Sequence, residues 1–243
     1  MDTSYDVIGV NYSDLREPDP RIEQAIHQAL GPAETVLNVG AGAGSYEPAG
    51  PRVTALEPSA EMIGQRRTPA AEVIQGHAED LPFDDNAFDA AMAVLTIHHW
   101  ADQAKGLREM RRVTRGPVVI LTYDPAFRGF WLEDYIPELT ALDDEKMPPL
   151  TLYGECLGSV EVSVVPVPHD CQDGFLYAYW RRPRAYLDPR IRAAMSSFWA
   201  IGDVSAGLGR LADDLASGIW EQRYAELLDL EERDLGYRLV ATV

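Results

Sequence analysis

The feature that most constrains this chain is a short apolar segment that runs into three alternating glycines. The segment Thr35–Val39 has the composition of a buried strand, and Gly40, Gly42 and Gly44 follow it. Because glycine has no Cβ, the backbone can bend sharply there and a ligand can lie directly on it. A second apolar segment ends at Glu57. Its spacing along the sequence from Gly40 is close to the spacing at which, in nucleoside-binding folds, a carboxylate meets the ribose hydroxyls. The pattern predicts a nucleoside-containing ligand at the carboxyl end of a parallel sheet.

Strand and helix patterns alternate through the first half of the chain. Strands are predicted at Thr35–Val39, Arg52–Glu57, Glu72–Gln75, Ala87–Leu95 and Pro117–Thr122, and helices at Arg21–Leu30, Ser59–Arg67 and Ala101–Thr114. This alternation is typical of a doubly wound α/β fold with a mostly parallel sheet. The apolar runs at 90–95 and 118–121 favour strands that are covered on both faces.

The second half is richer in aromatic residues, prolines and acids. We expect a strand at Val160–Val167, helices at Pro189–Trp199 and Ser205–Leu230, and a closing strand at Tyr237–Val243. The chain is predicted to form a single domain over residues 1–243. Its core would comprise about 21–125, 160–168 and 235–243, and an aromatic-rich helical cover would comprise about 126–159 and 169–234.

Composition excludes several classes of partner. The 243 residues carry a formal net charge of −18, which disfavours binding to nucleic acid or to an anionic membrane surface. There is no apolar run long enough to span a bilayer, and the acidic N-terminus does not resemble a secretory signal. The two cysteines lack metal-ligand spacing. We therefore expect a reduced, cytoplasmic protein without a metal site.

The details of the glycine turn bear on the kind of nucleoside ligand. A dinucleotide-binding turn has its third glycine one place later, where the helix packs closely on the strand. A pyrophosphate also requires a helix N-terminus without negative charge, and Glu47 followed by Pro48 is a poor opening for one. S-adenosylmethionine, which has no phosphates, needs only close backbone approach and an acid for its ribose. The turn therefore favours S-adenosylmethionine over a dinucleotide.

Four segments resemble the class I S-adenosylmethionine-dependent methyltransferases, in particular their bacterial small-molecule branch. They are Val36–Gly44, Leu56–Met62, the run from Gly76 to Asp89, and the run from Leu95 to Val113, in the family's order and spacing. The resemblance covers roughly 35–122. It implies a Rossmann-like sheet of seven strands whose last strand is antiparallel. It also implies methyl transfer from S-adenosylmethionine to an oxygen, nitrogen or carbon of a small molecule, such as a natural-product intermediate.

The resemblance assigns roles to individual residues. The three glycines would pass beneath the methionine part of the cofactor, Glu57 would accept from both ribose hydroxyls, and Leu95 would lie under the sulfonium. The remaining implied cofactor contacts are Met62 against the adenine ring, Ala78 and Glu79 along its edge, and Tyr12 and Arg16 from an N-terminal segment folded over the ligand.

Two positions depart from the family pattern. Asn38 stands where an acid commonly holds the cofactor's ammonium group, and it can accept a hydrogen bond without bringing a charge. His77 stands where an Asp often accepts from the adenine amino group, and a histidine accepts only as the suitable neutral tautomer. Both remain predicted cofactor contacts.

Methyl transfer to an oxygen or nitrogen requires alignment and, in many cases, removal of a proton. His98 and His99 follow the fourth strand at the entrance expected for a substrate, and His169 precedes Asp170. All three are candidate general bases, since histidine titrates near neutral pH. The alternative is structural, with one histidine capping a helix, another packing under the cover and His169 lying in a turn. No universal catalytic residue is expected if positioning supplies most of the rate.

Two other functions remain open at this point. The chain could keep the methyltransferase fold and bind the cofactor without transferring a methyl group, as a cyclase or a binding protein would. A nicotinamide oxidoreductase is disfavoured by the early third glycine and by the absence of a Tyr-x-x-x-Lys pair. A homodimer is a further alternative, because Trp199, Trp220 and Tyr224 could pack an interface as well as a core.

Overall fold

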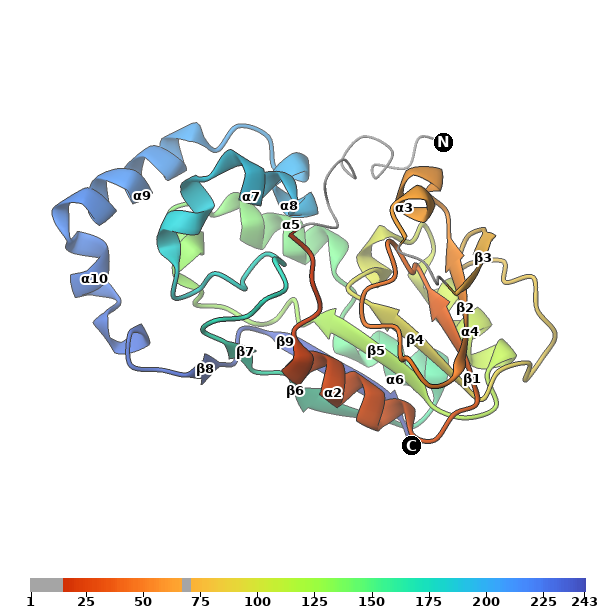
Figure 1. The fold of residues 1–243 in the computed structure, drawn as a ribbon. Coiled ribbons are helices and arrows are strands. Elements are labelled where there is room, and N and C mark those ends of the chain that lie inside the picture. The colour runs from red at the N-terminus through yellow and green to blue at the C-terminus, as the bar shows by residue number, and fades with distance from the viewer. Residues whose placement is uncertain (1–14, 67–70) are drawn as a thin grey trace.

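A computed structural model describes residues 15–66 and 71–243. Its main sheet has seven strands in the order β3-β2-β1-β4-β5-β9-β6 (Figure 1). The strands are β1 (Thr35–Val39), β2 (Arg52–Glu57), β3 (Glu72–Gln75), β4 (Ala90–Val94), β5 (Val118–Tyr123), β6 (Val160–Val164) and β9 (Tyr237–Thr242). Only β9 runs antiparallel to its neighbours, β5 and β6. The predicted mostly parallel α/β sheet with an antiparallel last strand is confirmed.

Helices cover both faces of this sheet (Figure 1). On one face α2 (Pro20–Leu30) packs against β4 and β5, and on the other α4 (Gln103–Val113) packs beside α6 (Leu150–Leu157). The short helix α3 (Ala60–Gly64) follows β2. Side chains cap these helices, since Asp19 accepts from the Arg21 N–H and Ser59 accepts from the Met62 N–H.

The cover is a group of short helices beside the sheet (Figure 1). It contains α5 (Glu138–Lys146), α7 (Pro189–Ala193), α8 (Ser196–Ala200), α9 (Ser205–Ser217), α10 (Ile219–Arg223), and the 3₁₀ turns Trp131–Asp134, Pro183–Leu187 and Ala225–Leu227. Fully buried aromatic rings hold it together, as when the Trp131 indole donates to the Trp180 carbonyl at 2.7 Å. One hydrophobic cluster continues from these rings to the α2 face of the sheet. The cover is therefore packed against the sheet through a shared core.

Several predicted boundaries were wrong in this half. The helix predicted over 189–199 is two helices, interrupted at Ala194 and Met195. The helix predicted over 205–230 ends at Gly218, whose φ of 75° is left-handed and closes α9. The strand predicted over 160–167 ends at Val164, because Pro166 has no N–H for the ladder. Beyond it, β7 (Val167–Pro168) pairs instead with β8 (Glu232–Arg233) in a separate small sheet.

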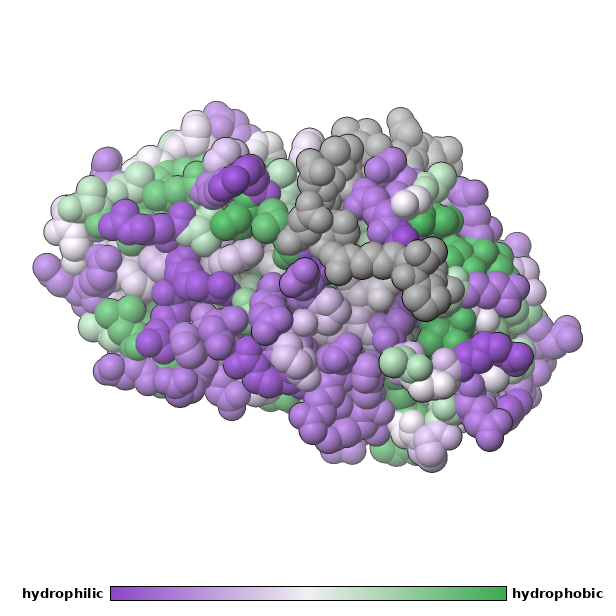
Figure 2. All heavy atoms as spheres, in the orientation of Figure 1, coloured by the Kyte–Doolittle hydropathy of each residue, from purple (hydrophilic) through white to green (hydrophobic). Residues whose placement is uncertain are grey.

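No helix within 15–66 or 71–243 is both long and apolar enough to cross a membrane. On the face shown in Figure 2, hydrophilic residues predominate and hydrophobic ones gather in separate groups. The larger hydrophobic side chains at the surface include Trp199 in the cover and Val162 and Val164 on the edge strand β6. Trp220 and Tyr224 are buried within the cover, so they contribute to the core.

Candidate functional site

A cavity lies at the carboxyl ends of β1, β2 and β4. Most residues with a predicted cofactor role line it, together with one of the candidate bases. These are Arg16, Asn38, Gly40, Gly42, Glu57, Met62, His77, Ala78, Glu79, Leu95 and His99. Gly44, His98 and His169 are not among its lining residues. Tyr12 lies outside the residues that the structure describes.

The glycine turn brings the backbone of β1 against the tip of β4. Gly40 has φ 69°, and a Cβ at this position would lie 2.2 Å from the Oγ1 of Thr96. Only glycine fits both the backbone angle and the space. A Cβ on Gly44 would instead meet the guanidinium of Arg66 at 3.2 Å, so Gly44 serves the close packing of Arg66 on the turn.

Glu57 is held at the end of β2 by backbone donors. Its carboxylate is buried, with one oxygen accepting from the Gly42 N–H at 2.8 Å and the other from the Ser59 N–H at 2.9 Å. A carboxylate oxygen can accept more than one hydrogen bond. The carboxylate is therefore fixed in position and able to accept from a vicinal diol, which is the geometry that a ribose requires.

Asn38 is oriented by an ion pair that sequence analysis did not predict. Its side-chain nitrogen donates to Glu47 at 2.9 Å, and Arg66 lies 2.7 Å from both oxygens of Glu47. Arg66 also donates to the Gly42 carbonyl at 3.2 Å. Because a carboxylate only accepts, the amide nitrogen of Asn38 must face Glu47. The amide oxygen is then the atom that can serve a ligand in the cavity.

The loop after β3 and the helix α3 form the other end of the cavity. Ala78 and Met62 are buried there and present apolar surface, while His77 is exposed. Glu79 accepts from the Asp102 N–H at 3.0 Å, so its carboxylate also fixes the start of α4. The flat apolar surface that Met62 and Ala78 provide is suited to an adenine ring.

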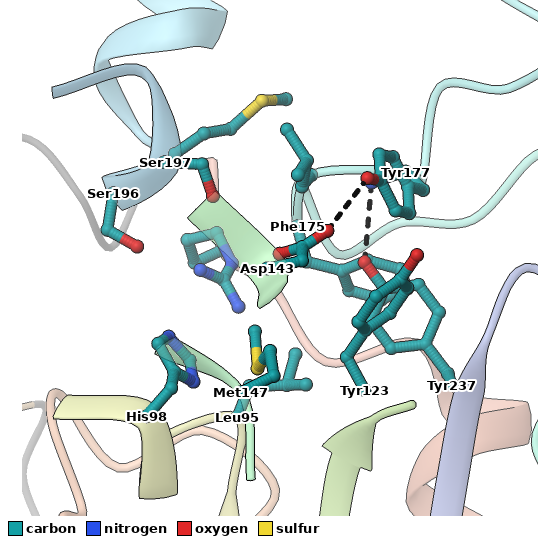
Figure 3. Close-up of a pocket in the computed structure, with 13 residues that line it drawn as sticks. Leu95, His98, Tyr123, Asp143, Met147, Phe175, Tyr177, Ser196, Ser197 and Tyr237 are labelled. Carbon is teal, nitrogen blue, oxygen red and sulfur yellow. Dashed lines mark hydrogen bonds between the residues drawn. The ribbon is translucent and has the colours of Figure 1, made fainter. Parts of the chain in front are cut away.

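A second cavity lies between the strand ends and the cover (Figure 3). It is lined by Arg16, Leu95, His98, Tyr123, Asp143, Met147, Phe175, Leu176, Tyr177, Met195, Ser196, Ser197 and Tyr237. Arg16 and Leu95 line both cavities. Leu95 has φ 49°, a left-handed angle that is costly for a leucine and is found mainly at functional sites. The two cavities therefore meet at the end of β4.

The three candidate bases occupy different places. His98 lines the second cavity and His99 the first, with their ring centroids 4.0 Å apart. Removal from bulk water lowers the pKa of His98 well below its usual range, and the neighbouring His99 and Arg16 lower it further. The side chain of His99 is exposed, and partial removal from water and the charge of Arg16 lower its pKa as well. Both rings are neutral at pH 7. His169 bonds to the Glu231 carbonyl beside the β7–β8 sheet and lines neither cavity.

A network around Asp173 joins the N-terminal segment, the glycine turn and the cover. Asp173 is buried, the Nε of Arg16 donates to it at 2.5 Å, and the Tyr46 hydroxyl donates to it at 2.9 Å. Tyr46 itself has φ 65°. Sequence analysis missed Asp173 and Tyr46, because neither belongs to a periodic pattern or a motif. A sequence signal for their contact does not exist, since they are separated by 127 positions.

Comparison with known proteins agrees with this geometry. Residues 37–120 match the model of the methyltransferase domain family. A solved protein from Anabaena variabilis, assigned as a methyltransferase from an antibiotic biosynthesis pathway, is 37% identical, with a TM-score of 0.87 over 94% of this chain and 99% of its own. The fold and the site therefore define an enzyme with a Rossmann-like fold that binds a nucleoside-containing cofactor. The chain belongs to the class I S-adenosylmethionine-dependent methyltransferases, and S-adenosylmethionine is its cofactor.

Two curated relatives are similar over the cofactor-binding region. The demethylmenaquinone methyltransferase of Renibacterium salmoninarum is 39% identical over 108 residues, which are 41% of this chain and 46% of the relative. A 2-methyl-6-phytyl-1,4-hydroquinone methyltransferase of Oryza sativa subsp. japonica is 28% identical over 155 residues, 57% of this chain and 47% of the relative. The chain thus spans about half the length of the curated relatives it matches. This family membership separates the chain from the nicotinamide oxidoreductases.

Proposed function

We propose that this protein transfers a methyl group from S-adenosylmethionine to an oxygen, nitrogen or carbon of a small molecule held in the second cavity. When bound, the cofactor supplies a methyl carbon that accepts the nucleophile's electron pair while the sulfur keeps the pair of the broken bond. The observation that carries the proposal is Leu95, which lines both cavities at the end of β4. The name of the Anabaena variabilis relative supports a natural-product intermediate as the substrate.

The first cavity fits the cofactor through groups already in place. Glu57 would accept from the ribose hydroxyls, and Gly40 and Gly42 would allow the ligand to lie on the turn. The amide oxygen of Asn38, oriented by Glu47, would accept from the ammonium group. In this arrangement a fixed dipole takes the place of the charge that the family pattern has at that position.

We infer that the rate enhancement comes chiefly from positioning and from exclusion of water. The second cavity is lined by apolar and aromatic side chains, which hold a substrate in place against the end of β4. His98, neutral in this cavity, can accept a hydrogen bond from a substrate O–H or N–H. His169 has no contact in either cavity that would support a catalytic role.

Packing of the cover on the α2 face also supports one domain over 1–243.

Ligand-dependent thermal unfolding tests the cofactor half of this proposal. S-adenosylhomocysteine at about a hundred times its dissociation constant should stabilise the protein by roughly 2.7 kcal/mol, while NAD and NADP should have no effect. Incubation with methyl-labelled S-adenosylmethionine and a panel of small molecules, followed by mass spectrometry, tests the transfer. Binding of S-adenosylhomocysteine without any labelled product would contradict methyl transfer and favour a non-methylating enzyme such as a cyclase.

A further inference from the structure

The second cavity contains a buried carboxylate for which the proposed function has no use. Asp143, on α5, is 4% exposed and is the only carboxylate among the described residues that line this cavity. Figure 3 shows it across the cavity from His98 and Leu95, directed toward the tyrosines at the other end. Its position in the lining of this cavity makes it available to a ligand.

Asp143 has a hydrogen-bond partner but no counter-ion. The Tyr177 hydroxyl donates to it at 3.1 Å. No arginine or lysine within 15–66 or 71–243 forms an ion pair with it. Arg16, which lines the same cavity, is paired with Asp173, and Arg128, whose charge acts on Asp143, is paired with the exposed Asp144. Within the described residues, the carboxylate is thus buried without an ion-pair partner of its own.

An unbalanced buried carboxylate is unfavourable in its ionised form. Burial raises the pKa of Asp143 to about 7. The charges of Glu133 and Asp144 raise it further, whereas the Tyr177 hydrogen bond and the charge of Arg128 lower it. The other titratable or charged groups at this cavity are the hydroxyls of Tyr123, Tyr177 and Tyr237, the neutral ring of His98, and the guanidinium of Arg16, which is paired with Asp173.

The walls beside Asp143 are aromatic. The rings of Tyr123, Tyr177, Tyr237 and Phe175 pack edge to face or tilted against one another around it. Aromatic faces attract organic cations, and more strongly where water is excluded. A carboxylate without a counter-ion, set among aromatic rings, is the chemistry that recognises a protonated amine.

We propose that the small molecule bound in the second cavity is an amine with a largely apolar frame, and that Asp143 binds its ammonium group as the counter-ion. This inference rests on the proposed function, because it takes the second cavity to be the substrate site. The ammonium supplies the ion-pair partner that Asp143 lacks among the described residues. Asp143 must be ionised to bind it, so a proton leaves Asp143 when the amine enters.

This proton release sets the pH dependence of binding. Below pH 7 the affinity for an amine should rise about tenfold per pH unit as Asp143 ionises. Above pH 7 it should level off, until the ligand loses its own proton near the pKa of about 10 typical of an alkyl ammonium. A neutral ligand of the same shape should show no such dependence.

Calorimetric titration of the protein saturated with S-adenosylhomocysteine tests the proposal. The probes are 2-phenylethylamine and tryptamine, each beside its alcohol isostere, 2-phenylethanol and tryptophol, between pH 6 and 8. The amines should bind at least tenfold more tightly than the alcohols at pH 8. Asp143→Asn should remove this preference and its pH dependence, whereas the neighbouring surface change Asp144→Asn should retain both.

Tyr177→Phe provides a second variant that keeps the shape of the cavity. Loss of the hydroxyl removes a hydrogen bond that lowers the pKa of Asp143, so the rise in amine affinity should move to higher pH. Equal binding of amines and alcohols, no binding of either amine, or an undiminished preference in Asp143→Asn would overturn the proposal. Failure to bind S-adenosylhomocysteine would instead contradict the proposed function.

Discussion

Two buried carboxylates, Glu57 and Asp143, line adjoining cavities but differ in the groups that stabilise their negative charge. Glu57 accepts from two backbone N–H groups that the turn and the start of α3 hold in place. Asp143 accepts from a single tyrosine hydroxyl and has aromatic neighbours. The first carboxylate is already stabilised as an anion and requires only hydrogen-bond donors from its ligand. The carboxylate of Asp143 is not stabilised in this way, so a ligand that binds it must carry a positive charge.

The largest effect, on cofactor affinity, should come from removing the carboxylate of Glu57. Glu57→Ala should cost roughly 3–6 kcal/mol of cofactor binding, because two hydrogen bonds to a charged group are lost at about 1.5–3 kcal/mol each. Titration with S-adenosylhomocysteine measures this loss. Glu61→Ala, on the exposed face of α3, is the matched control and should bind normally. An unchanged affinity in Glu57→Ala would contradict the assignment of the first cavity.

The carboxylate of Asp143 should make the stability of the protein depend on pH. The pKa of Asp143 is raised in the folded state, so its contribution to stability is present at low pH and is lost as pH rises toward 7. Between pH 5 and 8 the wild type should lose roughly 2–3 kcal/mol relative to Asp143→Asn. Urea denaturation of both proteins over this range measures the difference. A difference that is independent of pH would show that the carboxylate is already balanced by a charge.

A smaller effect on stability should distinguish the steric requirement for glycine at position 40 from the requirement of its backbone angle. Gly40 and Gly31 have similar positive φ angles, of 69° and 64°, but only Gly40 has a neighbour within reach of a Cβ. Gly40→Ala should therefore destabilise the protein by about 2 kcal/mol more than Gly31→Ala, owing to overpacking against Thr96. Urea denaturation compares them. Equal losses would mean that the turn can move away from Thr96.

The smallest effect is expected at His169. It lines neither cavity and its contact is to the Glu231 carbonyl, so His169→Ala should change stability and cofactor affinity by about 0.5 kcal/mol or less. Product formation, measured with any substrate found in the panel, should also be retained. A loss of turnover with normal cofactor binding would support the sequence-based prediction of a catalytic role.

The cofactor side of the molecule could be predicted because backbone geometry demands particular residues. Strands β1, β2 and β3 begin and end where the apolar patterns predict, and Gly40 and Glu57 follow from the turn and the strand end. Each requirement is local, within a few residues of a strand. Such requirements leave a pattern in the sequence.

The substrate side could not be predicted in the same way. Asp143 lies on a helix without a clear apolar face, and its partner Tyr177 is 34 positions away in a loop. Tyr177 belongs both to the hydrophobic core and to the lining of the second cavity. What makes these residues a site is burial without a counter-ion, and burial is a property of the packed chain.

The bond from Tyr46 to Asp173 also bears on whether this protein can be divided. Tyr46 keeps a left-handed backbone angle immediately after the glycine turn, and the carboxylate that holds its hydroxyl comes from the other half of the chain. The Rossmann-like half is therefore not a self-sufficient module that could be excised or grafted onto a new partner domain. Transplanting its motif alone would carry over the glycines without the anchor that shapes the end of their turn.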